Sequence, residues 1–407
     1  MTPEKGFTEE KVSSSDGLDR QPKLRFKADD GNEFPLWKPT VLNSIIKSFS
    51  QKVFGEHNYE ILTSSRDGLQ RQTEHFVAEQ RHDTDGYNII PMGYCTYRNR
   101  SDDRRFTFNV NNISRNAIVS KFYPVFCFVN SNSVFMTEYL NSSLSAIKTL
   151  SILSVGTSQV VLSFEVLKTA KFILPSEDEQ NKIANFITCL EQRIKCQENL
   201  VNSLKKYKRG LLSAIFERRI RFKADDGSEF PEWEEITMGE ICNYRNQHAE
   251  GEAFSYVSTE NMQQNCGGVI FEAENNRAVS GVAYKCGDTL VANIRPYLKK
   301  AWIADRDGVC STDVLVFNPT NVFPDFLYCL IARDSFFNYV MSGAKGLKMP
   351  RGDKAQIMQM PLVLPSLAEQ QKISAFLSEI DCKISTAELL LEAIKSAKRG
   401  LLQQLFI

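Results

Sequence analysis

Long hydrophobic runs are missing from this chain of 407 residues, in which no apolar stretch approaches the ~18 residues that a membrane-spanning helix requires. The first segment, residues 1–23, is polar and has neither the basic start nor the apolar centre of a signal peptide. We therefore expect a cytoplasmic protein that begins with a disordered tail.

Metal-binding and catalytic motifs are missing as well. The closest of the ten cysteines, Cys189 and Cys196, are seven positions apart (196 − 189), and there is no CxxC pair or Cys/His ligand spacing. The segment Asn318–Asn321 lacks the second proline and the aromatic residue of an adenine-methyltransferase tetrad, and no phosphate-binding loop or GxSxG motif occurs. The histidines lie in unrelated contexts: His57, His75, His82 and His248. We expect this chain to bind no metal and no cofactor and to have no catalytic activity of its own.

An excess of positive charge, the usual sign of a nucleic-acid-binding protein, is also missing, since 49 Lys and Arg balance 49 Asp and Glu. By segment, Lys38 to Lys171 carries a net charge of about +4, and Glu234 to Val363 carries about −3. A surface that binds nucleic acid must therefore be local.

What the chain does have is an internal repeat. The string RFKADDGNEFPLW at Arg25–Trp37 recurs as RFKADDGSEFPEW at Arg221–Trp233, an offset of 196 (221 − 25). The string LPSEDEQNKIANF from Leu174 recurs as LPSLAEQQKISAF from Leu364, an offset of 190 (364 − 174). The blocks between these strings share little sequence, so we predict two copies of one unit with different contents.

The segment after each LPS string predicts a long helix. Ser176 and Ser366 suit N-caps, and Glu179 and Glu369 stand at capping-box spacing. Apolar residues then recur at steps of four and three, interrupted at Gln197 and Lys208 in the first copy and at Ala387 and Lys398 in the second. The recurring residues are Ile183, Ile187, Leu190, Ile194, Val201, Leu204, Leu211 and Ile215, and then Ile373, Leu377, Ile380, Ile384, Leu391, Ile394, Leu401 and Leu405. The two helices share one heptad frame.

A seam of this length has to be buried against a partner helix, and the matched frame makes each helix the natural partner of the other. The alternative is that each helix covers only its own domain, but a helix of about 40 residues extends ~60 Å, beyond what such a domain covers. Since the first helix leads from one block to the next and the second returns, we expect an antiparallel pair. The N-terminal motif should then dock near the C-terminus, giving a pseudo-twofold molecule suited to a DNA site with two half-sites.

The predicted fold is of the α/β (α+β) class, because both blocks are rich in β-branched and aromatic residues with frequent turn signals. The predicted order is a disordered tail (1–23), a first target-recognition domain (24–173), a central spacer helix (174–219), a second target-recognition domain (220–363) and a C-terminal spacer helix (364–407). The two domains are separated by the antiparallel coiled coil.

Candidate DNA-binding residues lie in cationic and polar clusters, because Arg and Asn read guanine and adenine edges while Lys holds phosphates. In the first block they are Arg98, Arg100, Arg104, Arg105 and Lys121. In the second they are Asn293, Arg295, Tyr297, Lys299, Lys300, Lys345, Lys348 and Arg351. For any single arginine a solvated or salt-bridged role stays open, and Asp102 and Asp103 are candidates to neutralise Arg104. The aromatic residues Tyr97, Phe106 and Phe108 are expected in the core.

The two LPS helices, their KRGLL ends from Lys208 and Lys398 and the RFKADDG elements together resemble the specificity subunits of type I restriction-modification systems, from about Leu24 to Ile407. The second block adds YVSTENM from Tyr256, NIRPYLKKAW from Asn293 and CSTDVLVF from Cys310, and the first adds ILTSSRDGLQRQTEHF from Ile61 and YRNRS from Tyr97.

The resemblance implies that each block reads one half of a bipartite, asymmetric site in double-stranded DNA. It also implies that the chain binds two modification subunits, which carry S-adenosylmethionine and methylate adenine N6, and that restriction subunits join the complex. The residues themselves leave two alternatives open. One is a coiled-coil scaffold with protein-binding end domains, which the neutral charge favours, and the other is a self-contained nuclease, which the missing motifs disfavour.

Overall fold

The computed structural model describes residues 21–66, 68–72, 83–252, 255–271, 278–346 and 348–406, so most of the expected N-terminal tail, His75 and His82 lie outside the described residues. The chain divides into two units: unit 1 is Met1–Glu198 with Leu389–Ile407, and unit 2 is Asn199–Glu388. Within the described ranges, no helix is long and apolar enough to cross a membrane. Each unit holds one recognition block and one half of each long helix.

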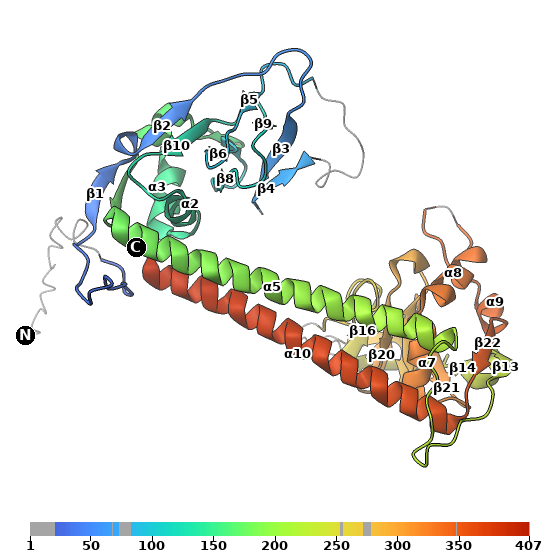
Figure 1. Cartoon of the computed structure of the whole chain (residues 1–407). Coiled ribbons are helices and arrows are strands. Elements are labelled where there is room, and N and C mark those ends of the chain that lie inside the picture. The colour runs from blue at the N-terminus through green and yellow to red at the C-terminus, as the bar shows by residue number, and fades with distance from the viewer. Residues whose placement is uncertain are drawn as a thin grey trace, which may run out of the picture. The chain divides into compact units, whose positions relative to one another are not determined.

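The two long helices are α5 (Glu177–Phe216) and α10 (Leu367–Leu405), whose halves lie side by side in each unit (Figure 1). All the apolar residues of the predicted seam are buried or half-buried, whereas most positions between them are exposed. Ile183 and Ile187 of α5 also join the core of the first block, and Ile373 and Leu377 of α10 join that of the second. The common heptad frame is confirmed, and the helix ends cover their own domains in addition.

Charged residues of the two helices pair across the seam. In unit 2, Lys205 and Lys208 of α5 contact Glu388 and Asp381 of α10, both at 2.6 Å. The α5 number rises from 205 to 208 while the α10 number falls from 388 to 381, so the helices are antiparallel. Lys208 is one of the two polar interruptions of the α5 seam, and its apolar stem stays in the seam while its ammonium group reaches the acid.

Unit 1 contains the same two pairs with the helices exchanged. Lys395 of α10 contacts Glu198 of α5 at 2.8 Å, and Lys398 contacts Glu191. Each residue is 190 positions from its counterpart (395 − 205, 398 − 208, 388 − 198, 381 − 191). Burial lowers the pKa of Lys398, but the nearby charge of Glu138 and the hydrogen bond to Glu191 outweigh it, so this pKa is raised. The predicted pseudo-twofold repeat therefore extends to individual ion pairs.

The first block contains two four-stranded sheets. One has the order β2-β10-β6-β8, with β2 (Ile46–Phe49), β10 (Val125–Phe128), β6 (Cys95–Tyr97) and β8 (Phe108–Val110). The other has the order β4-β3-β9-β5, with β4 (Gly68–Arg71), β3 (Glu60–Ser65), β9 (Ala117–Val119) and β5 (Asn88–Ile89). The remaining elements are the pair β1 (Lys38–Val41) and β12 (Lys171–Leu174), the pair β7 (Arg100–Ser101) and β11 (Val160–Val161), the turn η1 (Leu42–Ser44), and helices α2 (Ser133–Ser142), α3 (Leu144–Leu153) and α4 (Phe164–Lys168).

The second block also contains two four-stranded sheets. One has the order β14-β21-β18-β19, with β14 (Cys242–Tyr244), β21 (Val314–Pro319), β18 (Thr289–Ala292) and β19 (Ala301–Ile303). The other has the order β15-β17-β20-β16, with β15 (His248–Glu252), β17 (Ala278–Tyr284), β20 (Gly308–Cys310) and β16 (Tyr256–Val257). The remaining elements are the pair β13 (Glu234–Thr237) and β22 (Pro361–Leu364), the turn η3 (Pro296–Leu298), and helices α6 (Met238–Ile241), α7 (Pro324–Ile331), α8 (Asp334–Ser342) and α9 (Lys354–Met358).

The two blocks share one topology although their sequences share little. Each has one parallel strand pair in its second sheet, β3 with β9 and β16 with β20. In the first sheet of each block a central strand buries an aromatic residue, Phe126 on β10 and Phe317 on β21. In the helical parts the offset is 190, since α4 begins at Phe164 and α9 at Lys354 (354 − 164). The prediction of one architecture with two contents is confirmed, because the burial pattern repeats where the residue types do not.

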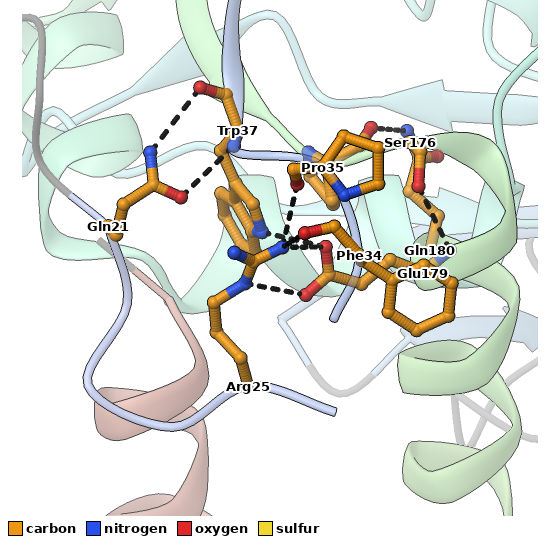
Figure 2. Close-up of polar contacts among 9 residues, drawn as sticks. Gln21, Arg25, Phe34, Pro35, Trp37, Ser176, Glu179 and Gln180 are labelled. Atoms are coloured by element: carbon orange, nitrogen blue, oxygen red, sulfur yellow. Dashed lines mark hydrogen bonds and ion pairs between the residues drawn. The ribbon is translucent and has the colours of Figure 1, made fainter. Parts of the chain in front are cut away.

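The RFKADDG motif holds the start of each long helix through a buried carboxylate. In unit 1, Glu179 is fully buried in the first turn of α5 (Figure 2). The Arg25 guanidinium donates to its two carboxylate oxygens at 3.0 and 2.7 Å, and the Trp37 indole nitrogen donates at 3.2 Å. Arg25 also donates to the carbonyl oxygens of Phe34 and Pro35, which closes its own motif into a loop. The hydrogen bond with Glu179 raises the pKa of Arg25.

The second copy forms the same arrangement in unit 2. Arg221 donates to the two carboxylate oxygens of buried Glu369 at 3.2 and 3.5 Å, and the Trp233 indole nitrogen donates at 3.1 Å. In unit 1 the backbone N–H of Leu24 donates to the carbonyl of Gln404 at 3.0 Å. The predicted docking of the N-terminal motif near the C-terminus is therefore confirmed.

The capping boxes predicted from spacing form only in part. The Ser176 and Ser366 hydroxyls accept from the backbone N–H of Glu179 and Glu369, both at 3.4 Å, as an N-cap should. The two carboxylates do not return to the backbone of the serines, because they face Arg and Trp side chains of the motif instead. The expected reciprocal half of the box is therefore wrong, and the tertiary partners replace the local one.

Changing Glu179 to Gln should loosen unit 1 and leave unit 2 unchanged. The variant keeps an acceptor for Trp37 but leaves Arg25 without its anion, and breaking one side of a buried pair costs about 3 kcal/mol. Hydrogen exchange should accelerate in the peptide that spans residues 25–37 and not in the one that spans 221–233. The matched variant Glu369→Gln should give the opposite pattern, and equal acceleration of both peptides by either variant would contradict this assignment.

Candidate nucleic-acid interface

The candidate residues of the first block lie on two connections. Four of them belong to the connection from β6 to β8, residues 98–107, and Lys121 belongs to the turn between β9 and β10. Arg98, Arg100 and Arg105 line one cavity of about 90 Å³ together with Arg66, which follows β3. All four arginines are exposed. Because guanidinium groups around one cavity repel each other until an acceptor lies between them, this cavity can hold a phosphate or the edge of a base.

One carboxylate offsets this charge in part. Asp103 forms an ion pair with Arg66 at 2.8 Å and accepts hydrogen bonds from the Ser101 hydroxyl and the backbone N–H of Arg105. The Ser101 hydroxyl, the Arg105 N–H and the charge of Arg66 lower the pKa of Asp103. Asp103 thus holds Arg66 at the cavity, an arginine that the sequence gave no reason to select.

Arg104 has a different role from its neighbours. Its guanidinium donates to the carbonyl oxygens of Ser151 at 3.3 Å and Gly156 at 3.2 Å, and its backbone has a positive φ of 62°. The hypothesis that Asp102 and Asp103 neutralise Arg104 is therefore wrong. Arg104 fastens the β6–β8 connection to the segment after α3, which makes it a positioning residue.

An exposed aromatic ring extends this surface. The Phe122 side chain lies in the β9–β10 turn and is 54% exposed. The Arg100 guanidinium lies 5.5 Å and the Lys121 ammonium 5.7 Å from its ring centroid, both at cation–π distance. Phe122 therefore connects Lys121 to the arginine cluster. Sequence reasoning missed Phe122, and it correctly placed Tyr97, Phe106 and Phe108 in the core.

In the second block five candidates lie on the topologically equivalent connection, from β18 to β19. Arg295 and Lys299 flank η3, and both have positive φ values, 55° and 50°. The Arg295 side chain and that of Tyr297 are exposed. Lys299 pairs with Asp334 at 2.6 Å, and Lys300 donates to the carbonyl of Thr259 at 2.6 Å. Arg295 and Tyr297 are thus the presented side chains of this turn, while the two lysines are engaged.

Asn293 differs from the other candidates because its amide oxygen is buried. This oxygen makes no hydrogen bond to any described residue. It lies where a Cβ atom on Gly352 would come within 3.0 Å. The amide oxygen therefore points into the protein and cannot accept from a base edge in this conformation.

The last three candidates of the second block lie in the hairpin 345–351. Lys345 pairs with Asp353 at 2.9 Å, and this hydrogen bond and charge raise the pKa of Lys345. Arg351 pairs with Asp313 at 2.9 Å, and Lys348 is exposed. Since Ile294 forms a β-bridge with Arg351, the hairpin lies against the β18–β19 connection. The structure therefore brings the two candidate segments of this block together.

Catalytic groups do not gather at either surface. Among the residues that the structure describes, no group of three or more His, Cys, Asp or Glu could hold a metal ion. The ten cysteines are free thiols. What both surfaces offer is hydrogen-bond donors and positive charge, which suits binding to an anion or to base edges.

Comparisons with known proteins point in one direction. The model of the type I restriction modification DNA specificity domain matches residues 77–206 and 231–396. The MjaVIII specificity subunit of Methanocaldococcus jannaschii, a type I restriction enzyme component, is 24% identical over 201 residues, which are 47% of this chain and 46% of that protein. The EcoDI specificity subunit of Escherichia coli is 26% identical over 102 residues, 25% of this chain and 23% of that protein. The matched part is thus less than half the length of these relatives.

Two solved structures share the fold. The S subunit of a type I restriction-modification system from M. genitalium has a TM-score of 0.55 at 15% identity, covering 95% of this chain and 99% of that one. A chain from a structure on complex assembly and conformational transition of the type I R-M system has a TM-score of 0.55 at 14% identity, covering 91% and 98%.

Replacing Arg104 with Ala should loosen the β6–β8 connection, because its side chain supplies two hydrogen bonds to carbonyls across the surface. We expect faster hydrogen exchange in residues 98–107 and 154–161, by roughly tenfold for ~1–2 kcal/mol of lost hydrogen bonding. Arg98→Ala is the matched control, since Arg98 is exposed and makes no hydrogen bond to the described residues. If the control accelerated exchange as much as Arg104→Ala, the tethering role would be wrong.

Proposed function

The chain belongs to the family of type I restriction-modification DNA specificity domains, and on that premise we propose that it is the sequence-reading subunit of such a complex. In this proposal each block reads one half of a bipartite, asymmetric site in double-stranded DNA. The observation that carries the proposal is that two blocks of one topology present different side chains at the equivalent connections β6–β8 and β18–β19. One scaffold with two different readers suits a site whose halves differ.

The proposal assigns the chemistry to partners. Specificity subunits are the non-catalytic members of these systems, and we propose that two modification subunits with bound S-adenosylmethionine dock on this chain and methylate adenine. Restriction subunits would complete the assembly, in the cytoplasm where the DNA is. We propose residues 24–173 and 220–363 as the readers, and 174–219 and 364–407 as the spacer.

Local charge supports DNA binding in spite of the neutral total. The cavity of the first block gathers Arg66, Arg98, Arg100 and Arg105, and only Asp103 pairs with a member of this set through an ion pair among the described residues. In the second block several cations face acids, which fits its negative net charge. We therefore expect the modification subunits to add phosphate contacts and the isolated chain to bind duplex weakly.

Salt dependence separates this function from the alternative, a coiled-coil scaffold with protein-binding end domains. We would purify the chain with its modification subunits and measure duplex retention at increasing salt, because phosphate contacts make log K fall linearly with log salt. Methylation sequencing of a host that carries the complete system should reveal a bipartite motif. Retention that is independent of salt, together with no methylated motif, would favour the scaffold.

Single arginine variants should disturb one half-site each. Arg295→Ala should relax discrimination only in the half read by the second block, and Arg98→Ala only in the half read by the first. A base-reading arginine contributes roughly 1–3 kcal/mol of discrimination, whereas a phosphate contact weakens binding to all sequences and lowers the salt slope by about 0.9. Methylation mapping of each variant complex is the measurement. Loss of discrimination in both halves from one variant would contradict the division of labour.

The helix pair should set the spacing between the half-sites. Four residues added to each helix lengthen it by ~6 Å and turn it by ~40°, and two added base pairs advance DNA by ~6.8 Å and turn it by ~70°. We would insert four residues after Asn199 and four after Leu389, midway between the pairs Lys208–Asp381 and Lys398–Glu191, where a matched stutter is absorbed by local unwinding. We expect methylation at unchanged half-sites with a spacer about two base pairs longer.

The control adds the same length at positions that break the register. Inserts after Leu190 and Ile380 move Glu191 away from Lys398 and Asp381 away from Lys208, so this complex should lose activity on both spacers. Normal activity of the first double insert on the original spacer would mean that these helices do not set the distance.

A further inference from the structure

Two short hairpins, residues 155–161 and 345–351, are copies of one element that carry different side chains. In the first, Val155 and Val161 exchange backbone hydrogen bonds of 3.0 and 2.8 Å. In the second, Lys345 and Arg351 exchange bonds of 2.9 and 3.0 Å. Each residue of one pair is 190 positions from its counterpart (345 − 155, 351 − 161), so the offset that relates the helices also relates the hairpins.

The turn and the buried positions agree as well. Gly156 and Gly346 both have a positive φ, 133° and 103°, and a Cβ on Gly156 would come within 2.5 Å of the Gln159 carbonyl oxygen. Val160 and its counterpart Pro350 are both buried. The described positions of the two hairpins have the same pattern of buried and exposed residues. Packing therefore fixes the backbone, and it leaves the exposed side chains free to differ.

Both hairpins also dock on the connection that holds the candidate arginines of their block. Val161 pairs with Arg100 in the β11–β7 ladder, and Arg351 forms a bridge with Ile294. Arg104 ties the first hairpin down further through the Gly156 carbonyl. Each hairpin is thus continuous with the cationic surface of its block.

The exposed side chains of the two copies differ in kind. Val155 is 72% and Val161 38% exposed, whereas the side chains at the equivalent positions, Lys345 and Arg351, are 82% and 57% exposed. Folding does not require valine at either position, because neither side chain is buried. Apolar side chains presented at the edge of a cationic surface indicate contact with an apolar group of the ligand.

We propose that these hairpins determine the specificity of each block, and that Val155 and Val161 recognise thymine through its C5 methyl group. This inference rests on the proposed function. Thymine is the one base that offers an apolar group in the major groove, while Arg reads guanine O6 and N7. Arg351, held by Asp313 at one edge of its guanidinium, is the corresponding reader of guanine in the second block.

A protein partner is the other class of occupant for exposed valines. It is disfavoured here because the neighbouring side chains Arg98, Arg100 and Arg105 are cationic and line one cavity, and because the equivalent positions of the second block are cationic too. A patch conserved in shape between the blocks but alternating between apolar and cationic character suits a surface that reads base edges.

The test replaces thymine with uracil, which removes only the C5 methyl group. The complex with its modification subunits would be given duplexes of its own mapped motif, with each thymine changed in turn. We expect uracil in the half-site of the first block to weaken binding about fourfold per lost methyl contact. Uracil in the other half-site should have a smaller effect. A first half-site without thymine, or one insensitive to uracil, would overturn the proposal.

Variants of the hairpin identify the side chains responsible. The double variant Val155→Thr with Val161→Thr keeps shape but replaces methyl groups by hydroxyls, and it should abolish the discrimination between thymine and uracil. The variant Val155→Lys with Val161→Arg should shift the preference of that half-site toward guanine. Leu144→Thr, at an apolar residue of α3 that is 74% exposed, is the control and should leave uracil sensitivity unchanged.

The outcomes separate this inference from the proposed function. If no bipartite motif is methylated at all, the function itself fails. If the motif is found and the two hairpin variants leave it unchanged while assembly with the modification subunits weakens, the valines face a protein and the inference alone is overturned.

Discussion

A buried carboxylate in the first turn of each long helix constrains the rest of the structure. Glu179 and Glu369 are fully buried, and a buried anion is tolerated only when cations and donors surround it. Arg25 and Trp37 supply them in one unit, and Arg221 and Trp233 in the other. In unit 2 the motif follows α5 and binds the start of α10, so the chain itself connects the two helices. In unit 1 the same joint forms beside the end of α10, through the Leu24 N–H and the Gln404 carbonyl.

This joint fixes the ends of the helices, and the seam then fixes their register. The polar interruptions at Lys208 and Lys398 would weaken a uniform apolar seam, but each ammonium group reaches an acid on the other helix. Because the same pairs occur in both units, a slip of one helix would break them all at once. The scaffold is therefore well determined, while the blocks that it carries vary in every exposed position. That separation explains how one fold can present two unrelated recognition surfaces.

The sequence predicts what depends on local pattern and on repetition. The repeat, the heptad frame, the antiparallel direction and the buried aromatics Tyr97 and Phe108 all follow from spacing. Spacing also gave a capping box for Glu179, and there the tertiary partner Arg25, 154 positions away (179 − 25), prevailed over the local one. The candidate interface was harder, because its geometry is non-local. Phe122 joins Lys121 to Arg100 only once β10 lies beside β6, and the hairpin at 155–161 carries no charge that would draw attention to it. Its equivalence with 345–351 is visible only in hydrogen bonds and burial.

The neutral charge of the chain, an objection to DNA binding at the level of composition, has a structural explanation. Lys299, Lys345 and Arg351 each face an aspartate, and Arg66 faces Asp103. Exposed ion pairs of this kind contribute little to folding, so exchanging a carboxylate for a DNA acceptor costs little. The acids nonetheless hold the cations in place and suppress the sequence-independent attraction to phosphate that dominates non-specific binding. A reader whose charges are satisfied in the free state releases them only where base edges and phosphates replace every lost partner. Balanced charge thus favours discrimination between sites over affinity for DNA in general.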